Sequence, residues 1–234
     1  MISSLQNGLV GVGLILEAIL IFLVLRQKYI RSYPLLFCFS LAQLFANFSE
    51  TLLLHTAGRA SDVYRLFYWA DEMVLDLLLF LTVITLTLKA LEGKPQRAAA
   101  GRLLGIIGGL VVVLPFLIFY RRGLFTNLWF TGYGQVLSFG GAIMNLALWT
   151  ALIGNKPRDA QLLALSAGVG LLATGQALFY GLFQFSDGPW KTLVDLLLAT
   201  TQVVGVAICC WSLWPKAEAI PQRTQGMLLP DTDP

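Results

Sequence analysis

The chain has 234 residues, of which 57% are hydrophobic and only 12% are charged. An ordinary soluble domain carries about 25% charged residues, so this composition excludes that class and indicates an integral membrane protein. At a net charge of +3 we expect the lipid bilayer to surround the chain, and we expect no nucleic-acid partner.

Seven apolar runs are long enough to cross a bilayer, for which about 20 helical residues are needed. The connectors between them are short and contain Gly, Pro, Asn and Asp, which are typical of helix ends and turns. We therefore predict an all-α membrane protein, a seven-transmembrane helix bundle formed by residues 1–214, followed by a disordered cytoplasmic tail at 215–234. The predicted helices cover residues 5–26, 33–55, 64–89, 102–121, 127–153, 160–184 and 190–214.

The basic residues are unequally divided between the two ends of these helices. If residue 1 is outside, eleven Lys and Arg residues lie on the inner side and five on the outer side. The positive-inside rule favours this orientation, and all six tryptophans, including Trp129 at the outer face, then fall near a membrane surface. We predict a multi-pass protein of a bacterial inner membrane, with the amino terminus outside and the carboxyl terminus in the cytoplasm.

Acidic residues within the predicted spans are the most informative feature of the sequence. A charge at the centre of a bilayer costs about 2.5–3.5 kcal/mol, and such groups usually face the bundle interior or a water-filled cavity. Every Lys and Arg, by contrast, falls in a loop, in the tail or at a helix end. The acids within spans are Glu17, Glu50, Asp71, Glu72, Asp76 and Asp195.

The first of them, Glu17, lies midway along the first helix and is expected to hydrogen bond to another helix rather than join an outer cluster. On the second helix, Gln43, Asn47 and Glu50 follow the spacing i, i+4, i+7, which places them within one arc. We expect this arc to face the bundle interior.

The third helix holds three acids, Asp71, Glu72 and Asp76. The last two are i, i+4 and share a face, whereas Asp71 points about 100° away and is expected among the lipid headgroups. Further inward-facing polar residues are expected on the later helices: Gln135, Ser138 and Asn145 on the fifth, Gln176 and Tyr180 on the sixth, and Asp195 and Gln202 on the seventh.

The candidate site combines the acids and amides that lie in the outer half or near the middle of the bundle. Two carboxylates about 6 Å apart repel by about 3 kcal/mol at an effective dielectric of 20, so Glu72 and Asp76 are expected to share a proton or a cation. A pocket for a small ligand and simple hydrogen bonding between helices are the two alternatives. The candidate binding residues are Glu50, Glu72, Asp76, Asp195, Gln135 and Gln176.

Two rows of small residues are expected to let helices approach closely, with an oligomer interface as the alternative. One row lies on the sixth helix and the other on the fourth. The rows are Ala173, Ala177 and Gly181, and Gly101, Gly105 and Gly109.

No cofactor, metal site or enzymatic activity is predicted. His55 is the only histidine, which excludes a haem held by two histidines within one subunit. A retinal Schiff base needs a lysine in the middle of the last helix, where only Lys191, at the outer edge, is present. The motifs of common hydrolases, metalloproteases and nucleotide-binding proteins are missing. A lipid-headgroup enzyme is the least favoured alternative.

Three stretches carry a resemblance to other proteins: "ILEAILIFLVLRQKYIRSYPLLFCFSLAQL" at 15–44, "YRLFYWADEMVLDLLLFLTVI" at 64–84 and "ATTQVVGVAICCWSLW" at 199–214. Together they resemble uncharacterised bacterial seven-helix membrane proteins with a glutamate in the first helix, a basic-Tyr-Pro connector and a Trp-rich end to the seventh helix. The resemblance implies the seven-helix topology and supplies no activity.

The sequence thus predicts a non-enzymatic membrane protein that binds a small ligand, a cation or a proton in an outer-half polar cavity. Such a protein is a sensor or a transporter. The alternative is a structural or accessory subunit of a larger membrane complex. The expected partners are therefore another membrane protein or further copies of the same chain.

Overall fold

The computed structural model contains seven long α-helices and one short 3-10 helix, and it describes residues 2–56, 58, 61–95, 97–118, 126–153, 159–183 and 189–215. No β-strand occurs among these residues, and the predicted all-α class is confirmed. Apart from Pro215, the predicted tail lies outside the described residues. The helices are α1 (Ile2–Arg26), η1 (Tyr29–Arg31), α2 (Pro34–Thr56), α3 (Asp62–Ala90), α4 (Arg97–Ile118), α5 (Asn127–Ile153), α6 (Ala160–Phe183) and α7 (Pro189–Leu213).

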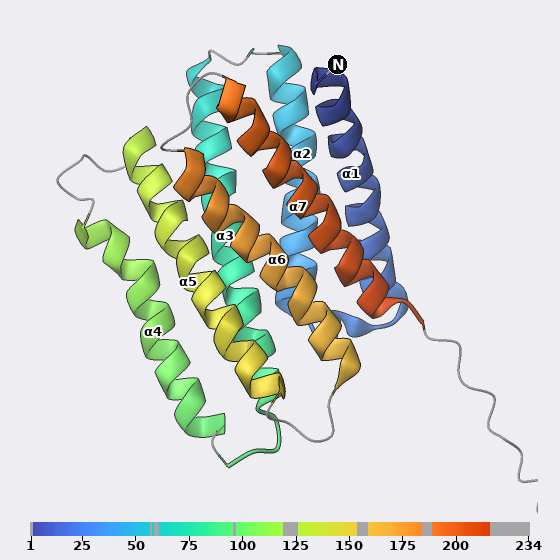
Figure 1. The fold of residues 1–234 in the computed structure, drawn as a ribbon, viewed down its shortest axis with the longest axis vertical. Helices are drawn as coiled ribbons and strands as arrows, with labels where there is room; N and C mark the ends of the chain where they lie inside the picture. Colours follow the sequence, from blue (N-terminus) through green and yellow to red (C-terminus); the bar gives the residue numbers. More distant parts are fainter. Residues whose placement is uncertain are drawn as a thin grey trace, which may run out of the picture.

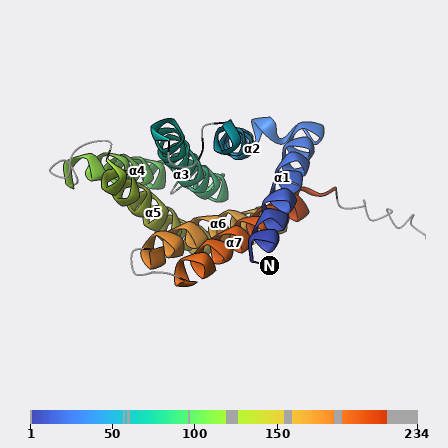
Figure 2. The ribbon, with the colours of Figure 1, turned by 90° about the horizontal axis from the view of Figure 1, so that it is seen from above.

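The seven long helices run alternately up and down through one bundle (Figure 1). Seen from above, α1, α2, α3, α5, α6 and α7 follow one another around a ring, which closes where α7 packs against α1 (Figure 2). Helix α3 also contacts α6 across this ring, and α4 packs on the outside against α3 and α5. The contact between α3, α5 and α6 therefore creates a three-helix centre within the bundle.

Six helices of the described part are long and apolar enough to cross a membrane: α1, α2, α3, α4, α6 and α7. Large apolar side chains are exposed on the outside of the bundle, for example Phe45 and Phe48 on α2 and Leu117 on α4. A soluble protein rarely exposes so much apolar surface, whereas a lipid environment favours it. These features support a membrane-embedded helical bundle. Helix α5 is not among the six.

Trp129, predicted near the outer membrane face, lies at the start of α5 and is covered by protein. Its side chain is 0% exposed and is enclosed by aromatic rings, with ring-centroid distances of 5.1 Å to Phe116, 5.1 Å to Phe130 and 5.3 Å to Tyr133. Because α4 lies against this end of α5, Trp129 is covered by protein. A hydropathy pattern gives the depth of a residue along its helix but not the neighbour that covers it.

The predicted row of small residues on α4 packs within this chain only at Gly101, where an added Cβ would lie 3.6 Å from Leu88 of α3. An added Cβ at Gly105 or Gly109 would meet no atom within 4 Å, whereas Gly108, outside the row, faces Ile84 at 3.0 Å. A close helix approach lies between α6 and α7, where a Cβ on Gly168 would lie 2.8 Å from the carbonyl oxygen of Gly205. The internal packing role of the row on α4 is therefore wrong for Gly105 and Gly109, and its alternative as an oligomer interface remains a prediction.

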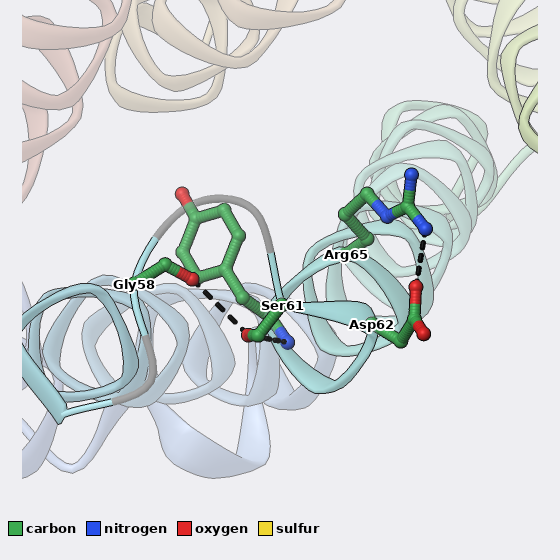
Figure 3. A network of polar contacts seen from close by, with 5 residues as sticks. Gly58, Ser61, Asp62 and Arg65 are labelled. Carbon is green, nitrogen blue, oxygen red and sulfur yellow. Dashed lines mark hydrogen bonds and ion pairs between the residues drawn. The ribbon is translucent and has the colours of Figure 1, made fainter.

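The start of α3 is fixed by a capping residue. The Ser61 hydroxyl accepts a hydrogen bond from the backbone N–H of Tyr64 at 3.1 Å and donates to the carbonyl oxygen of Gly58 at 3.1 Å (Figure 3). Asp62 and Arg65 form an ion pair in the first turn. A serine cap of this kind stabilises a helix by about 1 kcal/mol. It fixes where the polar face of α3 begins.

Candidate functional site

Two carboxyl groups of α3 meet a tyrosine of α6 in the three-helix centre. The Tyr180 hydroxyl lies 3.1 Å from Oδ2 of Asp76 and 3.4 Å from Oε2 of Glu72. Asp76 is 2% exposed and lies midway along α3. A tyrosine hydroxyl has one proton to donate, so it cannot supply a full hydrogen bond to both carboxyl groups at once. The predicted shared face of Glu72 and Asp76 is confirmed.

Helix α5 packs against Asp76 and Tyr180 in this centre. The Ser138 hydroxyl donates a hydrogen bond to Oδ1 of Asp76 at 3.2 Å. One turn earlier, a Cβ built on Gly134 would lie 2.7 Å from Asp76 Oδ2 and 2.7 Å from the Tyr180 hydroxyl. Glycine therefore lets the backbone of α5 approach the carboxyl–tyrosine pair. Ser138 belongs to the predicted inward-facing residues of α5. Gly134 was not predicted, because a helix pattern does not reveal where two helices approach closely.

Glu50 of α2 joins this group from the other side of α3. Its carboxyl group lies within hydrogen-bonding reach of the carboxyl group of Asp71, and it also interacts with Glu72. Oδ2 of Asp71 is buried, and Oδ1 accepts a hydrogen bond from the backbone N–H of Glu72 at 2.9 Å. The expected headgroup position of Asp71 is therefore wrong, because α2 covers the side of α3 on which it lies.

Within the described part of the chain, these four acids act on one another. Asp71 acts on Glu72, Glu72 acts on Asp76, and Tyr68 lies close to Glu50, Asp71 and Glu72. Carboxylates about 6 Å apart repel by about 3 kcal/mol at an effective dielectric of 20, and burial adds to the cost of charge. A hydrogen bond between two carboxyl groups also needs a proton on one of them. The group, which we name the carboxyl cluster, comprises Glu50, Asp71, Glu72 and Asp76.

A cavity of about 290 Å³ lies beside the carboxyl cluster and shares Tyr180 with it. Asp195 of α7, which is half-buried, stands on its wall. The fold thus brings Asp195 to the same tyrosine that contacts Glu72 and Asp76. The lining residues are Tyr64, Tyr68, Trp69, Thr131, Phe179, Tyr180, Lys191 and Asp195.

The two candidate amides, Gln176 on α6 and Gln135 on α5, do not line the 290 Å³ cavity. Gln176 is 7% exposed, and its Oε1 has no hydrogen-bond partner among the described residues. Gln135 is half-buried on α5, on the turn that carries Gly134. The assignment of both amides as binding residues stays a prediction.

Glu17 lies outside the carboxyl cluster, as predicted, and bonds between helices. The Asn47 side-chain amide donates to both carboxyl oxygens of Glu17, at 3.1 and 3.2 Å, which links α2 to α1. Glu17 is 4% exposed. The polar arc of α2 therefore contacts two helices. Asn47 hydrogen bonds to α1, whereas Glu50, three residues later, interacts with α3.

Replacing Asn47 by alanine is expected to destabilise the bundle, because Glu17 then stays buried without its donor. The expected loss is about 0.6–1.7 kcal/mol, the range for hydrogen bonds between membrane helices. Thermal unfolding of the purified protein measures it. Glu17→Gln keeps an acceptor for the Asn47 amide and serves as the control, with a smaller loss. Equal losses in the two variants would contradict this role of the hydrogen bond.

The chemistry available to the site follows from its donors and acceptors. No group of three or more His, Cys, Asp or Glu side chains among the described residues is arranged to hold a metal ion. The cluster instead offers paired carboxyl oxygens and tyrosine hydroxyls, which suit a proton or a ligand with a delocalised positive charge. A counter-charge of this kind removes the repulsion between the acids.

Comparison with protein-family models, with curated proteins and with solved structures finds no match. The resemblance to bacterial seven-helix membrane proteins therefore stays a prediction, and the site itself carries the functional argument.

Proposed function

We propose that this protein binds positive charge, as a proton or a small cationic ligand, at the carboxyl cluster and the adjoining cavity, and acts as a sensor or a transporter. One observation carries the proposal: Glu72 and Asp76 converge on a single tyrosine hydroxyl in the centre of an apolar bundle. Two buried carboxyl groups held side by side are costly to keep charged. Such groups within a membrane usually mark a binding site or an ion pathway.

The membrane arrangement is part of the same proposal. Helix α5 lies between α3 and α6 and matches them in length, which supports its counting as a seventh span. The excess of Lys and Arg on one side supports an amino terminus outside and a carboxyl terminus in the cytoplasm of a bacterial inner membrane. Helix α2 ends and α3 begins at the end of the bundle that holds the amino terminus (Figure 1). Glu50 lies in the last two turns of α2, and Asp71 and Glu72 lie in the first half of α3, so the carboxyl cluster then belongs to the outer half.

Proton flux into proteoliposomes tests the transporter form. Vesicles that enclose a pH-sensitive dye receive the wild-type protein or the Glu72→Gln, Asp76→Asn double variant, and an imposed membrane potential drives protons inward. We expect wild-type flux that the double variant loses, with Glu17→Gln as the matched control that keeps it. Flux that the double variant retains would remove the site. Binding without flux would assign the protein as a sensor.

An accessory subunit of a larger complex is the second candidate. The open row on α4 favours it, because Gly105 and Gly109 lie on a peripheral helix with nothing within 4 Å of an added Cβ. Small residues at this spacing let another helix approach closely. This role predicts that the protein purifies with a stoichiometric membrane partner, and that substitutions in the carboxyl cluster have little effect on that association.

A further inference from the structure

We infer that the 290 Å³ cavity is an aromatic cage for an organic ammonium ion, that is, a small quaternary ammonium or protonated amine. This inference rests on the proposed function and names the class of ligand at that site. It arises from a feature that the acids alone do not explain: five of the eight lining residues are aromatic.

The rings come from two helices and are mutually packed. Tyr64 and Tyr68 stack at 6.3 Å between ring centroids, and Trp69 meets Tyr68 edge to face at 5.4 Å. From α6, Phe179 and Tyr180 meet at 5.7 Å. Trp69 also stacks on Phe130 of α5 at 6.1 Å, so neighbouring rings hold it in place. The face of an aromatic ring attracts a cation, most strongly for tryptophan and when the cation has lost its water.

Charge favours the same ligand. Asp195 stands on the wall, and Tyr180 links the cavity to Glu72 and Asp76. Tyr68 lies between the cavity and the carboxyl cluster, since it lines the cavity and interacts with Glu50, Asp71 and Glu72. Lys191 is the basic residue on the wall. The acids near the cavity are Asp195 and the four acids of the carboxyl cluster behind Tyr68 and Tyr180. They outnumber the single ammonium group of Lys191.

The lining separates an organic cation from an inorganic one. A small metal ion is bound mainly by carboxylate and carbonyl oxygens in place of its water, and the side chains of this wall supply one carboxylate, that of Asp195, beside the hydroxyls of Thr131 and three tyrosines. An alkylammonium ion spreads its charge over methyl or methylene groups, which lose water at little cost and contact the rings directly. The cavity volume of about 290 Å³ lies just below the usual range for small-molecule sites, about 300–1,000 Å³, and suits a small ligand.

A second hollow provides an internal control. It has a volume of about 440 Å³ and is lined by residues of the outer ends of α6 and α7, including Leu182, Trp190 and Leu193, with no acid among its lining residues. Trp190 is 67% exposed. Trp190 thus lies near the same end of the bundle in a hollow without acids. Replacing it shows the effect of losing a tryptophan that is not part of the cage.

Equilibrium dialysis of radiolabelled choline against the purified full-length protein tests the inference. We expect saturable binding that Trp69→Leu or Tyr68→Leu weakens by about 2- to 30-fold each, as expected when one cation–π contact is lost. Tyr68→Phe keeps the ring and should bind within about twofold of wild type. Trp190→Leu should bind as the wild type does. Circular dichroism of each variant verifies that the bundle is folded.

A neutral competitor separates charge from shape. The alcohol 3,3-dimethylbutan-1-ol has the shape of choline with carbon in place of nitrogen, and we expect it not to displace choline. Displacement at equal concentration, or no choline binding at all, would overturn the inference. The proposed function fails separately, because it requires an effect of Glu72→Gln and Asp76→Asn on proton flux or on carboxyl protonation even where choline does not bind.

Discussion

A Gly134→Ala variant is expected to lose binding at the cavity and to be destabilised by about 1–3 kcal/mol, the usual cost of overfilling a packed interior. The new methyl carbon would lie 2.7 Å from Asp76 Oδ2 and from both the Cζ and the hydroxyl oxygen of Tyr180. Real Cβ atoms essentially never approach so closely, so Asp76 or Tyr180 must move. Either movement breaks the hydrogen bond between them, and Tyr180 is also part of the cavity wall.

Gly141→Ala is the matched control for this variant on the same helix. A Cβ at Gly141 would lie 3.6 Å from the Cβ of Ala173, which is an ordinary van der Waals contact. Thermal unfolding and choline dialysis of the two variants give the comparison. If Gly134→Ala were as stable as Gly141→Ala and bound choline equally well, the close contact of α5 with the carboxyl pair would not matter for the site.

The Glu72→Gln, Asp76→Asn double variant is expected to lose binding and flux while the bundle stays at least as stable as the wild type. The amides keep the shape of the side chains and can still pair with Tyr180 and Ser138, but they remove the repulsion between two buried acids. Residues kept for function commonly reduce stability, so their replacement stabilises the fold. Thermal unfolding and proteoliposome flux, measured on the same preparation, test both parts.

The structural alternative makes the opposite prediction for this variant. If the acids serve only to join α3 to α5 and α6, the amides should change stability by no more than about 0.6 kcal/mol per bond and leave binding and flux intact. A destabilised variant with unaltered binding would therefore contradict a functional role for the carboxyl pair.

The shared face of Glu72 and Asp76 was predictable from the sequence because the 3.6-residue period relates positions on one helix. The same period extends toward the helix start, where Tyr64 and Tyr68 precede Glu72 at four-residue steps. That spacing was a signal for the aromatic wall of the cavity. The spacing alone does not decide whether such tyrosines face the bundle interior or the membrane interface, where aromatic residues are also common.

The errors share a physical cause, which is that a helix pattern does not identify the neighbouring helix. Asp71 points away from Asp76, as predicted, but α2 covers that side, so its carboxyl group meets Glu50 rather than lipid headgroups. The burial of Trp129 against Phe116 of α4 is likewise not visible in the helix pattern, although it leaves the predicted depth of Trp129 untested. Gly134 is explained only by the side chains of two other helices. The helices themselves follow from local composition, whereas these contacts depend on tertiary packing.

Infrared spectroscopy of the carboxyl groups tests the central claim most directly, because protonated and ionised carboxyls absorb at different frequencies. At neutral pH we predict a carbonyl band of protonated carboxylic acid in the wild type that weakens in the Glu72→Gln, Asp76→Asn variant and changes when choline is added. The Glu17→Gln variant should keep the choline-dependent change. A spectrum in which the double variant retains both the full band and its response to choline would contradict the account.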